Sequence, residues 1–115
     1  MLNEDGILSL YIDRYEFTGG ANGVTVRDGD TWEAGFPLRL KVMESNKRKI
    51  QRQVVDTIKQ RQSGGEIYFE PVKRYVHKYY DPKQYYLTLD GITAFYQEIT
   101  IAPHSSGIVT FPLIL

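Results

Sequence analysis

Apolar residues spaced three and four positions apart indicate one helix in the middle of the chain. Together they form a single stripe on a helical surface, among residues that favour helices. Ser45 or Asn46 can cap the start of the helix, and Ser63–Gly65 provides the glycines that commonly end one. The pattern predicts an amphipathic helix over about 45–62. The stripe consists of Ile50, Val54, Val55 and Ile58.

Before this helix, alternating and β-branched residues predict strands. A long strand is expected over 7–17, with Leu8, Leu10 and Ile12 on one face, and a glycine-rich loop over 18–23 follows it. A second strand is expected from Val24 to about Trp32, with a turn or bulge at Asp28-Gly29-Asp30. A short strand over 36–40 leads into the helix, and its Pro37, which has no N–H donor, favours an edge position.

After the helix, the pattern predicts a hairpin and a last strand. The segment 66–80 is ambiguous, because Pro71 prevents a helix from running through it. Two alternating segments flank Asp90-Gly91, which is a strong hairpin signal, and a last strand is expected over 108–111.

These elements predict an α+β fold in which one amphipathic helix, about 45–62, packs on a mostly antiparallel sheet with a C-terminal hairpin. With 115 residues, 42% of them hydrophobic, the chain has room for one core. It contains no repeat or linker. We therefore expect residues 1–115 to form a single domain.

Charge is unevenly distributed, although 14 basic and 14 acidic residues cancel. The formal charge is −4 over residues 1–40, +5 over 41–62 and −1 over 63–115. The basic helix could meet phosphate, but we interpret its charges mainly as the solvated outer face of an amphipathic helix. Because the whole chain is neutral, no nucleic-acid partner is predicted.

Several chemistries lack their sequence signatures. The chain has no cysteine, no zinc-protease or phosphate-loop motif and no Gly-x-Ser-x-Gly elbow. The glycine-rich loop precedes a strand and has no lysine, which argues against a phosphate cradle. No apolar run is long enough for a membrane span, and no secretory signal opens the chain. We predict no cofactor and no metal.

A few side chains remain as weak catalytic or metal-binding candidates. His77 and His104 are the only histidines, and a metal-dependent enzyme would need a carboxylate cluster around one of them. Ser105 and Ser106 follow His104, but neighbours in sequence seldom form a catalytic pair. Asp28 and Asp30 lack the ligand pattern of a calcium loop and are interpreted as solvated turn carboxylates.

Nine tyrosines are the most informative feature of the composition. Several of them, including Tyr79, Tyr80 and Tyr85, are concentrated around the predicted hairpin. Exposed tyrosines offer contact area for a protein or stack on sugar rings. Ordinary cross-strand packing on a half-buried sheet is the alternative interpretation.

Three parts of the chain together resemble a bacterial extracytoplasmic domain family of largely unknown function. Tyr15–Gly23 is similar to its Tyr-x-Tyr-Thr-Gly-Gly-Ala-His-Gly pattern, although Asn22 stands in the position of the histidine. Trp32–Leu40 resembles the stretch that leads into the family's helix. Tyr85–Ile92 and Ile99–Ile108 resemble its C-terminal hallmark, which contains an Ile-Ala-Pro turn, with His104 replacing a tyrosine.

The family includes the C-terminal sensor domains of RsiV-like, lysozyme-sensing anti-sigma factors, and similar domains accompany polysaccharide deacetylases. The resemblance implies a non-enzymatic, extracytoplasmic binding module of the cell envelope that lacks the family's upstream half. Its partner would be a lysozyme-like protein or, alternatively, a cell-wall glycan, and unpaired sheet edges would favour a homodimer. The expected partner-binding residues are Thr18, Gly19, Gly20, Asn22, Tyr79, Tyr80, Tyr85, His104, Ser105 and Ser106.

Overall fold

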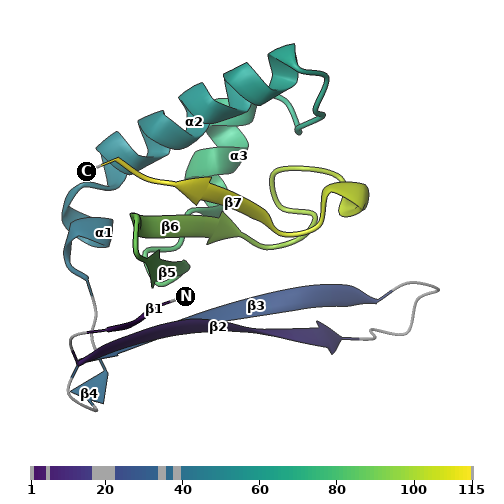
Figure 1. Cartoon of the computed structure of the whole chain (residues 1–115). Helices are drawn as coiled ribbons and strands as arrows, with labels where there is room; N and C mark the ends of the chain where they lie inside the picture. Colours follow the sequence, from purple (N-terminus) through teal and green to yellow (C-terminus); the bar gives the residue numbers. More distant parts are fainter. Residues whose placement is uncertain (1, 5, 17–22, 34–35, 38–39, 115) are drawn as a thin grey trace.

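The protein has three layers, seen in a computed structural model that describes residues 2–4, 6–16, 23–33, 36–37 and 40–114. Helices form the first layer, a small sheet the second and another sheet, drawn out into a long hairpin ribbon, the third (Figure 1). The helices are α1 (Val42–Ser45), α2 (Lys47–Ser63) and α3 (Val72–Tyr79). None of the helices in these ranges is long and apolar enough to cross a membrane.

Both sheets are antiparallel. The outer sheet has the order β1-β2-β3-β4, and the inner sheet has the order β5-β6-β7. The prediction of an α+β fold is confirmed, with two sheets instead of one. The outer strands are β1 (Leu2–Glu4), β2 (Ile7–Glu16), β3 (Val24–Glu33) and β4 (Phe36–Pro37), and the inner strands are β5 (Tyr85–Thr88), β6 (Gly91–Tyr96) and β7 (Val109–Pro112).

Helix α2 is the helix that the apolar stripe predicts. It ends in two hydrogen bonds typical of a Schellman motif, from Gly65 N–H to the Gln62 carbonyl at 3.0 Å and from Glu66 N–H to the Arg61 carbonyl at 3.1 Å. Gly65 adopts a φ of +98°. At the other end, Asn46 occupies the capping position but its side chain makes no cap hydrogen bond, so the predicted side-chain cap is wrong.

Two helices lie outside the single helix of the prediction. Helix α1 directly precedes α2, and α3 occupies the segment that the sequence left ambiguous. Pro71 is the residue at which α3 is capped, in extended conformation. Since proline cannot donate the N–H of a helix interior, it marks the start of this helix and does not exclude one.

The hydrophobic core lies between the helices and the inner sheet. Its largest fully buried side chains include Tyr96, Phe111, Ile50 and Ile58. Tyr96 and Phe111 meet edge to face, with ring centroids 5.8 Å apart. Among the described residues, none before Leu40 belongs to this core cluster. The outer sheet is therefore held against the rest of the molecule by other contacts.

Strand β3 passes very close to β5 at Gly29. A Cβ at this position would lie 2.2 Å from the carbonyl oxygen of Tyr85 and 3.3 Å from the Phe95 ring. Only glycine fits between the two sheets here. The turn or bulge predicted at Asp28-Gly29-Asp30 is wrong, because Gly29 pairs with Tyr11 in an unbroken register.

The remaining elements agree closely with the expectations. Strands β5 and β6 form the predicted hairpin, and β7 is the predicted last strand. Of the expected strand over 36–40, Phe36–Pro37 form β4, which lies at an edge as Pro37 favours, and residues 38–39 lie outside the described residues. Between β6 and β7 the chain forms a 3-10 turn, η1 (His104–Ser106).

Candidate functional site

The free edge of β3 meets the loop that follows β6, and we call this contact the β3 junction. It consists of Gly23, Thr25 and Arg27 on one side and Gln97, Glu98 and His104 on the other. Among the described residues, strand β4 pairs only with the far end of β3, at Trp32 and Glu33. Side chains, and not a neighbouring strand, therefore satisfy this part of the β3 edge.

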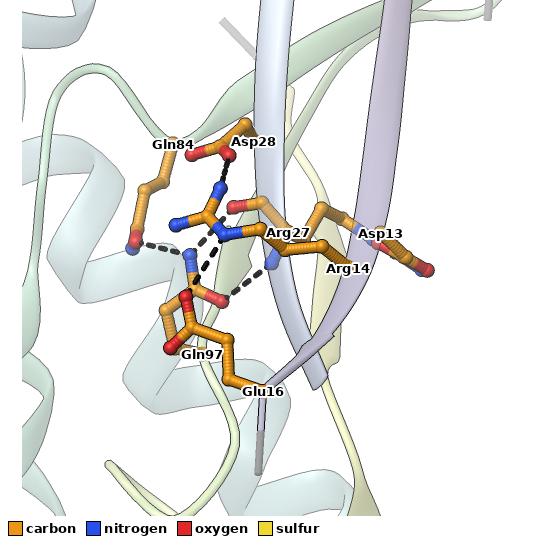
Figure 2. Close-up of polar contacts among 7 residues, drawn as sticks. All are labelled: Asp13, Arg14, Glu16, Arg27, Asp28, Gln84 and Gln97. Atoms are coloured by element: carbon orange, nitrogen blue, oxygen red, sulfur yellow. Dashed lines mark hydrogen bonds and ion pairs between the residues drawn. The ribbon is translucent and has the colours of Figure 1, made fainter. Parts of the chain in front are cut away.

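Gln97 takes the place of a neighbouring strand. Its Oε1 accepts a hydrogen bond from Arg27 N–H at 2.9 Å, and its Nε2 donates to the Arg27 carbonyl at 2.6 Å (Figure 2). The Gln97 amide is fixed in turn by Gln84 Oε1, which accepts from Nε2 at 2.9 Å. An amide side chain carries both a donor and an acceptor, so it can pair with both backbone groups of one residue.

Glu98 and His104 continue this edge toward the end of the ribbon. Glu98 Oε2 accepts the N–H of Thr25 at 3.0 Å and lies 3.6 Å from His104 Nε2. His104 Nε2 also lies 3.2 Å from the Gly23 carbonyl oxygen. Because a carbonyl only accepts, Nε2 donates in this hydrogen bond. The Glu98 side chain is 11% exposed and that of His104 is 51% exposed, so the histidine forms the outer surface of the junction.

Gly23 is buried and lies against the Tyr15 side chain. A Cβ here would lie 2.4 Å from the Tyr15 ring, whose hydroxyl accepts the N–H of Gly23 at 2.9 Å. The close approach of Tyr15 and the contact with His104 fix both sides of this residue. The end of the ribbon is thus attached to the inner half of the molecule.

A strained residue lies within the same loop. Ile99 adopts a φ of +61°, in the left-handed region that a β-branched side chain rarely occupies, and it is 47% exposed. It directly follows Glu98, whose carboxylate holds Thr25. Backbone strain of this kind is concentrated at binding and catalytic sites, where the surrounding structure maintains it.

An acidic groove of about 440 Å³ opens beside the junction. Three carboxylates, those of Asp28, Asp30 and Asp81, line it and outnumber its two cations, Arg27 and Lys83, while the Phe95 ring forms its apolar part. Asp28 forms an ion pair with Arg14, whereas Asp81 accepts the backbone N–H of Lys83 at 2.8 Å. No ion pair involves Asp30 or Asp81 within the described ranges, so these two carboxylates are open to a cation.

A cation within the ribbon is tightly paired across the two strands. Arg27 donates to Asp13 in two hydrogen bonds, from Nε to Oδ1 at 2.7 Å and from Nη2 to Oδ2 at 2.9 Å. The guanidinium also lies 3.8 Å from the centroid of the Tyr11 ring. Hydrogen bonding from Arg27 lowers the pKa of Asp13, and the Asp13 carboxylate raises the pKa of Arg27.

The predicted site residues are distributed over two places. Thr18, Gly19, Gly20 and Asn22 lie outside the described residues. His104, Ser105 and Ser106 form η1, with both serines exposed. The described end of the glycine-rich loop, Gly23, and the His104 turn are brought together.

The tyrosines predicted for partner binding pack against the core. Tyr85 is 5% exposed and its hydroxyl accepts the N–H of Leu40 at 3.1 Å. Tyr80 donates to the Met43 carbonyl, and burial raises the pKa of Tyr80 to about 12. Tyr79 stacks on Tyr75, with centroids 6.4 Å apart. Within the described ranges, no hydrogen bond or ring contact links Tyr79 or Tyr80 to η1.

Three residues of the junction are not predictable from the local sequence. Gln97, Glu98 and Thr25 carry no local pattern, because the partners in these contacts are about 70 residues apart in sequence. The pair of Asp13 and Arg27 could be anticipated from the sequence, since opposite charges at facing positions of a hairpin favour each other. Among the described residues, no group of three or more histidines and carboxylates is arranged to hold a metal.

Comparison with known proteins identifies the family. A search of curated proteins finds no match. The chain resembles the crystal structure of a DUF3298 family member from Bacteroides fragilis, with a TM-score of 0.65 and 22% sequence identity. The similarity covers 97% of this chain and 47% of that one. The sequence model described as "Protein of unknown function (DUF3298)" matches residues 40–113. The chain therefore belongs to the DUF3298 family.

Proposed function

We propose that this domain is a non-enzymatic, extracytoplasmic binding module that recognises a basic protein of the lysozyme type. The observation that carries the proposal is the acidic groove beside the β3 junction, where three carboxylates outnumber Arg27 and Lys83 and where Asp30 and Asp81 form no ion pair among the described residues. Such a groove suits a lysine or arginine side chain of a partner. The resemblance to sensor domains of lysozyme-responsive anti-sigma factors points to the same class of ligand.

The distribution of charge supports a basic partner. The ribbon β2–β3 carries exposed carboxylates at Asp28, Asp30 and Glu33, within an N-terminal third whose formal charge is −4. Complementary charges accelerate association and select the partner. The position of the groove on a ribbon that is fixed by Gln97 and Glu98 supports binding by a preorganised surface.

The assignment as a non-enzyme rests on how the polar groups of the junction are used. The Glu98 carboxylate accepts a backbone N–H, and the His104 imidazole donates to a backbone carbonyl. Both groups hold the ribbon in place, and the hydroxyls of Ser105 and Ser106 make no hydrogen bond to either of them among the described residues. This arrangement suits a binding surface better than an acid–base pair.

Calorimetric titration with a C-type lysozyme, at about 0.15 M salt, tests the proposal. We expect saturable 1:1 binding by the native domain. The triple variant Asp28→Asn, Asp30→Asn, Asp81→Asn should lower the association rate constant, measured separately by stopped-flow fluorescence, about tenfold, because steering by charge is lost. Asparagine at position 81 keeps an acceptor for the Lys83 N–H.

A matched variant removes three carboxylates that do not line the groove, Asp56→Asn, Glu66→Gln and Asp90→Asn. Its association rate should change much less than that of the groove variant. An equal decrease of the association rate constant in the two variants, or no binding of lysozyme by the folded native domain, would overturn the proposal. Binding of peptidoglycan fragments without lysozyme binding would favour the alternative, a cell-wall glycan-binding module of the kind that accompanies polysaccharide deacetylases.

A further inference from the structure

A second groove, of about 690 Å³, lies between α2 and α3. Five cationic side chains line it, together with a single carboxylate, Asp56. Four of the cations belong to α2 and one to α3. The cations are Lys47, Arg48, Arg52, Lys59 and Lys73.

The cations follow α2 along its length. Arg48, Arg52 and Lys59 are four and seven residues apart, which places them on one face of the helix. From Lys47 to Lys59 the helix rises about 18 Å. Across the groove, Lys73 and His77 are one turn apart on α3. The lining is therefore extended and matches a chain-like ligand better than a compact one.

These five cations are not paired with acidic side chains of the described chain. In the part of the chain that the structure describes, none of the five cations has a carboxylate within 4.0 Å. The ion pairs found there involve Arg14, Arg27 and His104 instead. Arg48, Arg52 and Lys73 are exposed. Five like charges gathered in one groove repel each other, and a bound anion would relieve that repulsion.

The start of α2 is also unusual for a helix. Lys47, Arg48 and Lys49 occupy its first turn, which contains no acidic residue, and no side chain caps it. Helix N-termini carry a positive partial charge and ordinarily favour acidic side chains. A second hollow, lined partly by Lys47, Arg48 and Arg52, extends the cationic surface over this end. An anion near this end would interact with both the side chains and the helix dipole.

We propose that the α2–α3 groove binds an extended polyanion of linked phosphate groups that carries no nucleobases. Lysines, which form three of the five cations, bind phosphate as point charges, and the helix N-terminus favours the same group. Apart from His77, the lining contains no aromatic ring. Single-stranded nucleic acids are bound largely by stacking bases on aromatic side chains, which this groove lacks.

Calorimetric titration with short-chain inorganic polyphosphate, repeated over a series of salt concentrations, tests this site. The variant Arg52→Gln, Lys59→Gln, Lys73→Gln should bind at least tenfold more weakly than the native domain. The plot of log affinity against log salt concentration has a negative slope, and its magnitude should decrease by about 2, because three phosphate contacts are lost. These side chains are exposed, and thermal unfolding checks that the variant is folded.

The control variant, Lys41→Gln, Lys78→Gln, Lys83→Gln, removes the same charge from exposed positions that do not line this groove. Its affinity should change less than threefold. Equal losses in the two variants, or no binding of polyphosphate to the native domain, would overturn the proposal. So would tighter binding of single-stranded DNA or of polyglutamate of the same charge. Lysozyme binding should be unaffected by Arg52→Gln, Lys59→Gln, Lys73→Gln. This result would separate the α2–α3 groove from the acidic groove.

Discussion

The inner and outer sheets are stabilised in different ways. The inner sheet, β5–β7, packs apolar side chains under α2 and α3, where Tyr96 and Phe111 are each 1% exposed. The outer sheet exposes apolar side chains instead, since Leu8 is 38% and Ile12 58% exposed. Polar contacts connect the two sheets, including a hydrogen bond from Leu87 N–H to the buried Ser9 hydroxyl at 2.7 Å.

This difference shows that the two halves contribute in different ways to stability and recognition. The half formed by residues 40–113, to which the family model matches, contains the hydrophobic core. The ribbon carries the acidic groove and is positioned by individual side chains. Hydrophobic burial is non-directional, whereas hydrogen bonds fix geometry, so the core provides most of the stability and the polar contacts set the position of the ribbon.

The largest effect is expected in the core. Phe111→Ala should destabilise the protein by about 3–5 kcal/mol, because it leaves a cavity beneath Tyr96. Ile12→Ala is the matched change in the ribbon and should alter stability by less than about 0.5 kcal/mol. Urea denaturation measures both. Similar losses in the two variants would show that the ribbon contributes to the core after all.

A smaller effect is expected where the sheets approach most closely. Gly29→Ala should cost about 1–3 kcal/mol, because the added methyl group would overlap the Tyr85 carbonyl. Gly64→Ala is the control, since a Cβ there would meet only the Arg61 carbonyl, at 3.4 Å. Thermal unfolding of the two variants compares them. If Gly29→Ala is as stable as the native protein, the sheets are not in tight contact.

Removing the side chain that caps β3 should loosen the ribbon locally. Gln97→Ala leaves the N–H and carbonyl of Arg27 without these partners, at a cost of about 1–2 kcal/mol. Hydrogen exchange should become faster at the Arg27 amide and stay slow at the Phe95 amide, which bonds to the Gln84 carbonyl. Gln97→Glu keeps the acceptor for the Arg27 N–H and should preserve more of its protection. Uniformly faster exchange would instead indicate global destabilisation.

The smallest effect concerns the ion pair across the ribbon. Because Arg27 lowers the pKa of Asp13, this pair stabilises the folded state above the unfolded pKa of about 4, and the contribution is lost as the pH falls through the folded pKa. Asp13→Asn should cost less than about 1 kcal/mol at neutral pH and flatten the loss of stability below about pH 4. Urea denaturation from pH 2 to 7 tests this. An unchanged acid profile would show that other carboxylates determine it.

Local patterns were sufficient for most of the secondary structure. The apolar stripe located α2, and the Asp90-Gly91 signal located the β5–β6 hairpin, although Leu89 and Asp90 form its turn. The same patterns suggested a bulge at Gly29, because glycine between two aspartates looks like a turn. The actual requirement at Gly29 is the neighbouring Tyr85 carbonyl, which is distant in sequence.

The sequence by itself determined the α+β class, the helix over 47–63, the C-terminal strands and the separation of acidic and basic segments. These features follow from periodicity and composition, which act between near neighbours. Only the tertiary structure decided that Gln97 caps Arg27, that His104 reaches Gly23 and that the cations of α2 face Lys73. These contacts join residues that are far apart in sequence, so their geometry exists only once the layers have packed.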